Sequence, residues 1–220
     1  MSKYRIQYIQ NDDVKFISHL DFLRTINRVF MRAKAPVKFS NGFNPHLVMT
    51  IGLPLSVGTT SECDVLDNEL TESVDTNKFM LDLNATCPDG IRITKITEAE
   101  NLKPLHMIDS AIYEAHFNTD AEIDMQKFFD VEEFLIEKKS KRGLNMVNIK
   151  DFIRNLEAID SHKKYGLKMH INAGNFSNLK PELVLKAMSE YLGFSATDIE
   201  ICRKKIFLDD GSEPLNAVCE

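Results

Sequence analysis

Residues 18–34 read SHLDFLRTINRVFMRAK, a stretch in which apolar side chains recur at the spacing of an α-helix. Its apolar positions are Phe22, Ile26, Val29, Phe30 and Ala33. Ser18 followed by Asp21 is typical of a capping box in which Asp takes the place of Glu. Pro36 disfavours any continuation of the helix. The sequence therefore predicts a helix over about residues 18–34.

The segments around this helix predict the other elements of a β-α-β-β-α-β unit. Residues 3–9 alternate apolar and polar side chains, which is the period-two pattern of a half-buried strand. We expect further strands at 37–39, 47–51, 61–70 and 91–97, and a second helix at 75–86. If the extra hairpin extension within residues 37–51 is ignored, this order is that of a ferredoxin-like unit, in which two helices cover one face of an antiparallel sheet.

The second half of the chain repeats this order. We expect strands at 110–118, 132–138, 165–172 and 199–208, and helices at 120–130 and 181–192. Residues 143–160 fit either a strand or a helix. The sequence therefore predicts an α+β fold of two ferredoxin-like (βαββαβ) units in tandem, with antiparallel sheets and helices on one face. The predicted units are residues 1–100 and 108–220, joined by a linker near Asn101–Pro104.

Composition limits the classes of function. With 220 residues, 43% of them hydrophobic, the chain is long enough to bury a core. It contains no run of about 18 apolar residues and does not begin like a secretory signal, so we expect a cytoplasmic protein without a membrane span. Its four cysteines lie far apart and form no CxxC pair, which favours reduced thiols over a metal or redox site. Glycine-rich nucleotide-binding patterns are also missing, so we expect no cofactor in this chain.

Basic residues are concentrated near the start of the chain. The whole chain has a net charge of -6, whereas residues 1–50 contain eight Lys or Arg residues and three acidic ones. Arg24, Arg28 and Arg32 lie one helical turn apart, opposite the apolar positions, and form either a phosphate-binding track or a solvated helix face. A second basic segment contains Lys138, Lys139, Lys141 and Arg142. This segment fits a loop that clamps phosphates or simply a solvated loop.

Polar residues at the start of the predicted helix indicate a binding corner. A right-handed β-α-β crossover brings the loop after the second strand to the end of the sheet at which the helix begins, unless residues 14–17 pair back onto the first strand. With residues 37–39 as the second strand, that loop lies beside Ser18 and His19. The loop contains Asn41, Phe43, Asn44 and His46. A helix N-terminus, amides and an aromatic ring suit an RNA contact, although turn chemistry alone also explains the loop, and His19 fits a packed core histidine equally well.

Three runs of sequence carry a resemblance to a known family. They are FISHLD at 16–21, FSNGFNPH at 39–46 and LPLSVG at 53–58, together with the arginines of the predicted helix. In these runs the chain resembles the radical SAM-linked protein family, a bacterial domain of unknown function that is fused to, or encoded beside, cobalamin-binding-type radical SAM proteins. Leu47 departs from the family, which often has Pro there, and Asn27 and Phe30 replace the Ala and Arg that enrich the family's helix.

The resemblance implies a radical SAM protein as partner. That partner would carry the iron–sulfur cluster, S-adenosylmethionine and cobalamin, because this chain lacks the Cys-x-x-x-Cys-x-x-Cys pattern that holds a four-iron cluster. The resemblance also implies RNA or a ribosomal component as the target. We therefore expect an accessory or substrate-binding partner of a radical SAM enzyme that holds RNA or an RNA-associated substrate.

Two other functions fit the same residues. The first is a metal-independent RNA-processing or RNA-modifying enzyme in which His19 or His46 is the general acid or base. The second is a protein–protein adaptor that binds no RNA and docks the radical SAM protein through a sheet edge or through the acidic segment 61–100.

Overall fold

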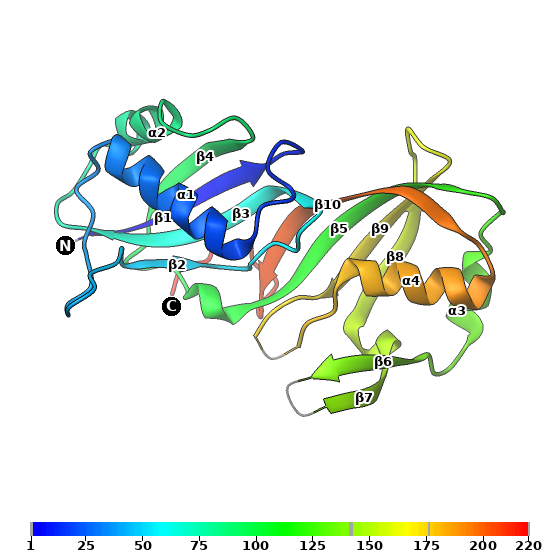
Figure 1. The fold of residues 1–220 in the computed structure, drawn as a ribbon. Helices are drawn as coiled ribbons and strands as arrows, with labels where there is room; N and C mark the ends of the chain where they lie inside the picture. Colours follow the sequence, from blue (N-terminus) through cyan, green and yellow to red (C-terminus); the bar gives the residue numbers. More distant parts are fainter. Residues whose placement is uncertain (1, 141–142, 176, 220) are drawn as a thin grey trace. The chain divides into compact units, whose positions relative to one another are not determined.

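The computed structural model describes residues 2–140, 143–175 and 177–219. The chain divides into two compact units, one formed by Met1–Ile108 together with Arg203–Glu220 and the other by Asp109–Cys202. In the described residues the fold is mixed α/β, with four α-helices and mostly antiparallel strands (Figure 1). No helix in these ranges is long and apolar enough to cross a membrane.

The first unit is built on an antiparallel sheet. Its strands are β1 (Ser2–Gln10), β2 (Met49–Ile51), β3 (Thr59–Leu70) and β4 (Ile91–Glu98), and its helices are α1 (His19–Arg32) and α2 (Thr76–Asn84). The strand order is β4-β1-β3, β2 pairs with the other side of β3 at Asn68–Leu66, and all of these pairings are antiparallel. The part of β10 (Ala196–Leu208) that starts at Arg203 belongs to this unit and is also a neighbour of β3.

Both helices of the first unit pack on one face of this sheet. One cluster of buried residues contains Tyr4, Ile6 and Tyr8 of β1 together with residues of both helices. The helix residues are Phe22, Ile26, Val29 and Phe30 of α1 and Phe79 and Leu83 of α2. Burial of each large apolar side chain contributes roughly 1.5–3 kcal/mol to stability. This explains why the apolar face of β1, which has the period-two pattern, packs against the apolar faces of the helices.

The second unit contains its own helix-covered strands. They are β5 (Ile108–Thr119), β8 (Ile153–Ile159), β9 (Tyr165–Asn172) and the first part of β10, in the order β10-β5-β9-β8. The helices are α3 (Met125–Asp130) and α4 (Pro181–Leu192), and β6 (Leu135–Ser140) pairs with β7 (Gly143–Asn148) as a separate hairpin. Short 3-10 turns occur at Leu105–Met107, in the first unit, and at Ile149–Phe152.

Most predicted elements are confirmed, and the ambiguous stretch is resolved. The helices expected at 18–34, 75–86 and 181–192 are α1, α2 and α4, and α4 starts with Pro181 as expected. Residues 143–160 form β7, a 3-10 turn and β8. The strand expected at 37–39 is wrong, because Val37 and Phe39 form only isolated bridges and the true β2 starts at Met49. The tandem arrangement of two ferredoxin-like units stays a prediction.

Candidate functional site

The start of α1 is held by a side-chain cap. Ser18 has extended backbone angles, and its hydroxyl oxygen accepts a hydrogen bond from the Asp21 backbone N–H at 3.2 Å. The same hydroxyl donates to the Asp21 carboxylate at 2.8 Å. The hydrogen bond from Ser18, followed by one from Arg24, lowers the pKa of Asp21 below its ordinary value. Ser18 is therefore confirmed as the predicted cap residue. Its predicted partner Asp21 accepts a hydrogen bond from the Ser18 hydroxyl.

Ser18 and His19 line a small pocket at this end of α1. Tyr8, Gln10 and Pro54 also line it, and its empty volume is about 330 Å³, with the open solvent at its mouth included. The rest of the lining is Val14, Lys15, Ile17, Phe22, Ile51, Leu55 and Ser56. His19 is exposed, so the interpretation as a packed core histidine is wrong. Burial, followed by the charge of Asp64, raises the pKa of Tyr8 well above 10.0, which keeps its hydroxyl protonated.

The predicted corner does not form, because the loop at residues 41–46 lies at the other end of the sheet. Lys38 N–H donates to the Glu69 carbonyl, and Glu69 pairs with Lys3 near the start of β1, whereas α1 follows the end of β1. The crossover rule itself holds, but the second strand is β2 and not residues 37–39. The loop that reaches the start of α1 is therefore residues 52–58, whose Gly58 N–H donates to the Lys15 carbonyl at 2.6 Å.

The loop at 41–46 is closed by its flanking residues and presents an aromatic ring. Ser40 Oγ lies 2.9 Å from His46 Nδ1 and accepts the His46 backbone N–H at 3.1 Å. Asn41, Asn44 and His46 are exposed, and Phe43 is fully exposed at 109%. His19 and His46, the two predicted acid–base candidates, thus lie at opposite ends of the first unit and do not form a pair.

The predicted arginine stripe is present on the exposed face of α1. Arg24, Arg28 and Arg32 are all exposed, and Arg24 pairs with Asp21 at 2.9 Å. Leu20 and Met31 are exposed on the same side of the helix, at 63% and 56%. At 1.5 Å per residue, α1 is about 21 Å long, so the stripe runs most of the way from the pocket to the end at which the 41–46 loop lies.

The second predicted basic segment cannot be placed. Lys141 and Arg142 lie outside the described residues, and so do the side chains of Lys138 and Lys139.

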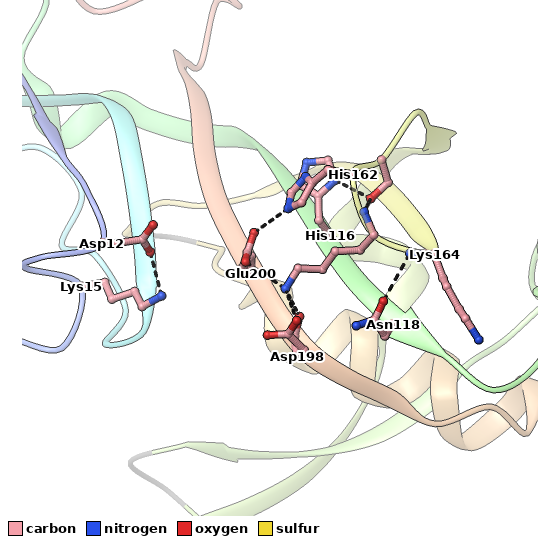
Figure 2. Close-up of polar contacts among 10 residues, drawn as sticks. Asp12, Lys15, His116, Asn118, His162, Lys164, Asp198 and Glu200 are labelled. Carbon is pink, nitrogen blue, oxygen red and sulfur yellow. Dashed lines mark hydrogen bonds and ion pairs between the residues drawn. The ribbon is translucent and has the colours of Figure 1, made fainter.

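A cluster of titratable residues that the sequence did not predict lies in the second unit (Figure 2). The rings of His116 in β5 and His162, in the turn between β8 and β9, are in contact, with centroids 4.8 Å apart and planes tilted by 43°. His116 Nδ1 lies 2.9 Å from Ser161 Oγ, and His162 Nε2 lies 2.9 Å from Glu200 Oε2 in β10. Each imidazole is therefore oriented by a different partner.

A lysine fixes the carboxylate of this cluster. Lys163 Nζ lies 2.9 Å from Glu200 Oε1 and 2.7 Å from Asp198 Oδ2, and its side chain is only 7% exposed. Desolvation alone would lower the pKa of Lys163, but its hydrogen bonds to Asp198 and Glu200 outweigh that effect and raise the pKa. The hydrogen bond from Lys163, with a further one from His162, lowers the pKa of Glu200. Glu200 is therefore ionised at neutral pH, and its carboxylate accepts a hydrogen bond from His162 Nε2.

The second unit holds a further histidine with a hydroxyl partner. His170 Nε2 lies 3.0 Å from Ser110 Oγ, and burial, followed by the charge of Arg154, lowers the pKa of His170. The charge of the Asp109 carboxylate acts on the pKa of His170 in the opposite direction. No group of three or more His, Cys, Asp or Glu residues in the described parts of the chain could hold a metal ion.

Comparison with known proteins places the chain in a family. Residues 3–181 match a family described as an uncharacterized protein conserved in bacteria (DUF2344). The chain belongs to the DUF2344 family. No curated protein matches this DUF2344 chain. A crystal structure of an unknown protein from Galdieria sulphuraria is 12% identical, with 92% of this chain and 98% of that chain covered, and its TM-score of 0.28 does not establish a shared fold.

The matched range includes the candidate residues of α1 and of the loop at 41–46. It also includes the cluster around His116 and His162, except for Asp198 and Glu200. Sequence reasoning identified Ser18, His19 and the arginines of α1 because their signals are local. It missed the pairing of His116 with His162 because these residues are brought together only by the antiparallel pairing of β5 with β9, in which His116 lies opposite Gly166. The one signal in the sequence was Ser161-His162-Lys163-Lys164, a polar turn between two strands.

Proposed function

We propose that this chain is a binding module that holds a single-stranded RNA segment, or an RNA-associated substrate, for a separate enzyme. The observation that carries the proposal is the exposed row of Arg24, Arg28 and Arg32 on α1. Guanidinium groups bind phosphates through two parallel hydrogen bonds, and a row spaced by one helical turn contacts successive phosphates of one strand.

The two ends of α1 supply chemistry that suits the same ligand. At one end the exposed ring of Phe43 offers a surface on which a base stacks, and the amides of Asn41 and Asn44 offer donors and acceptors to base edges. At the other end His19 and the pocket beside Tyr8 offer polar contacts. The ligand in this proposal runs along the helix from one end to the other.

The strand orders support a finer description of the fold as two ferredoxin-like units. In the first unit the order is β4-β1-β3 with β2 beside β3, and in the second it is β10-β5-β9-β8. If the β6–β7 hairpin is treated as an insertion, the strands of each unit, counted along the chain, lie in the order fourth, first, third, second. This is the strand order of a βαββαβ unit. Fold alone does not transfer activity, so the proposed function rests on α1 and its ends.

We propose a radical SAM enzyme as the partner, in keeping with the sequence resemblance. That enzyme would supply the iron–sulfur cluster, S-adenosylmethionine and cobalamin, and this chain would supply the substrate contacts. The exposed Leu20 and Met31 beside the arginines are apolar surface that suits protein contact.

The test is RNA affinity as a function of salt. For single strands the logarithm of the association constant falls with the logarithm of salt concentration with a slope of about -0.7 for each phosphate neutralised. The triple variant Arg24→Gln, Arg28→Gln and Arg32→Gln should therefore lose about 2 units of slope on a labelled single-stranded RNA of about 20 nucleotides.

A matched control removes the same charge elsewhere in the first unit. Lys78, Arg92 and Lys95 are exposed and lie on α2 and β4. Their replacement by Gln should leave the slope close to that of the wild type. Equal losses in the two triple variants, or no measurable RNA binding by the wild type, would refute the RNA proposal. Retention of a radical SAM partner without RNA binding would leave the adaptor function in its place.

A further inference from the structure

We infer that the pocket at the start of α1 recognises the ribose 2′-hydroxyl of one nucleotide and so selects RNA over DNA. The inference rests in part on the proposed function, because the strand that enters the pocket is the one that the chain is proposed to hold. It deepens that function, since the arginines of α1 contact phosphates, and RNA and DNA share these.

The buried hydroxyl of Tyr8 is the observation that carries the inference. Tyr8 is only 1% exposed, and its ring stacks on Phe22 with centroids 5.2 Å apart. Tyr8 lines the pocket, and no residue in the described part of the chain binds its hydroxyl. This hydroxyl is not sealed by protein atoms, so the open space that it reaches is the pocket. Because buried hydroxyls are nearly always hydrogen-bonded, this one suits a water molecule or a ligand group in the pocket.

The polar groups next to Tyr8 bind one another and leave its hydroxyl available. Asp64 lies opposite Tyr8 in the pairing of β1 with β3. The Asp64 carboxylate accepts hydrogen bonds from Gln10 at 2.7 Å, Ser61 at 2.6 Å and Arg203 at 3.0 Å. All of these side chains are buried, and Gln10 also lines the pocket. The network therefore fixes one wall of the pocket without using Tyr8.

The charge and the size of the space beside Tyr8 favour a neutral hydroxyl group over a phosphate oxygen. Burial, followed by the negative charge of Asp64, raises the pKa of Tyr8, and the same charge disfavours an anion beside the Tyr8 hydroxyl. The enclosed part of the pocket has room for about one water molecule. A ribose hydroxyl fits about the same space, and it both donates and accepts a hydrogen bond, as the hydroxyl of Tyr8 does.

The start of α1 suits the phosphate that follows this hydroxyl in an RNA strand. Ser18 and His19 line the same pocket, and the backbone N–H of His19 is one of the first in α1, which have no partner within the helix. Such helix starts bind phosphates, and the carboxylate of Asp21 at this end is paired with Arg24. In RNA the 2′-hydroxyl lies beside the 3′-phosphate of the same nucleotide. A hydroxyl next to Tyr8 therefore brings a phosphate to the end of α1 at which the arginine row begins.

A packing role for Tyr8 predicts a different result. Tyr8→Phe keeps the ring that stacks on Phe22 and removes only the hydroxyl. If Tyr8 only packs, this variant binds RNA and DNA as the wild type does. The ratio of the two affinities therefore separates recognition from packing.

The assay measures fluorescence anisotropy with a labelled RNA strand of about 20 nucleotides, the length used for the salt test, and with the matching 2′-deoxy strand. Loss of one buried hydrogen bond should lower the ratio of RNA affinity to DNA affinity by about 5- to 10-fold in Tyr8→Phe. The salt slope should stay that of the wild type, because Tyr8 neutralises no phosphate. Tyr4→Phe is the matched control and should keep the wild-type ratio. Tyr4 is buried on the same strand, but its hydroxyl accepts the Val74 backbone N–H at 3.1 Å.

The outcomes distinguish this inference from the binding function. RNA binding with the same ratio in the wild type and Tyr8→Phe would overturn the inference and leave the binding function standing. If the protein retains no strand, adenosine 3′-monophosphate and its 2′-deoxy form test the pocket alone, because they differ only in the 2′-hydroxyl. Larger shifts of the Tyr8 ring resonances in NMR spectra with the ribonucleotide would support the pocket and refute strand binding. Equal shifts, or none, would refute both.

Discussion

Removal of the Asp67 charge should destabilise the first unit more than any surface substitution. Asp67 in β3 is buried and forms two hydrogen bonds with the fully buried Arg5 of β1, at 2.7 Å and 3.0 Å. Two further donors of Arg5 bind the carbonyls of Pro214 and Lys103, at 2.6 Å and 2.8 Å. Asp67 also accepts Lys3 at 2.8 Å.

The magnitude follows from the charge that the substitution leaves behind. In Asp67→Asn the guanidinium of Arg5 keeps its place but loses its counter-ion, and an unpaired buried charge costs about 3–5 kcal/mol. The carbonyls of Pro214 and Lys103 stay bound, so the loss should not grow beyond this range. With an m value of about 2 kcal/mol per molar urea, the unfolding midpoint should fall by about 1.5–2.5 M.

The assay is urea unfolding followed by circular dichroism, with Glu213→Gln as the control. Glu213 pairs with Lys205 at 3.1 Å, but both side chains are about half exposed, so its loss should cost less than about 1 kcal/mol. A cost for Asp67→Asn as small as that of the control would refute the reasoning. It would mean that water reaches Arg5 or that the strands shift to solvate it.

Three further substitutions or titrations test local features. Ser18→Ala should cost about 1 kcal/mol of stability, and it should raise the pKa of Asp21 toward its ordinary value in an NMR titration. Because the folded pKa of Asp21 is lowered, its contribution to stability is present above the unfolded pKa and is lost as the pH falls through the folded value. Cys87 should react with iodoacetamide more slowly than the exposed Cys219 at pH 8, because burial raises the pKa of Cys87 to about 11; equal rates would contradict this. Phe43→Ala should change stability by less than about 0.5 kcal/mol but weaken RNA binding by about 1–3 kcal/mol, measured by thermal unfolding and fluorescence anisotropy.

The parts of the fold that the sequence predicts are those with local causes. Ser18 and Asp75 mark helix starts through side-chain hydrogen bonds within one turn, and Pro181 does so through its fixed φ angle. The structure has helices at all three positions. Residues 37–39 have the alternation of a strand but find only isolated bridges, because the edge of β3 is occupied from Asn68 to Leu66 by β2. Which of two short segments pairs with β3 depends on contacts across the sheet, and no local pattern expresses it.

The candidate functional residues were likewise predictable from the sequence only where the signal is local. The arginines of α1 were predictable because a helix places residues four apart on one face. The His116–Ser161 and His162–Glu200 contacts join residues 45 and 38 positions apart, so their formation depends on the strand order of the second unit. A lone histidine in a turn carries no such information, and His162 therefore gave no signal of a partner.

The three runs that carry the family resemblance separate into two places in the structure, and this division shapes the binding proposal. FISHLD at 16–21 and LPLSVG at 53–58 meet at the start of α1, where Gly58 binds Lys15 and both runs line the pocket. FSNGFNPH at 39–46 lies at the opposite end, where the backbone of Lys38 binds Glu69. Under the proposed binding function, a ligand at only one end would leave Arg28, which lies between the two ends, unused. A strand that lay along α1 would contact both ends and all three arginines, so the proposed extended path would account for more of these residues than the single corner predicted from the sequence.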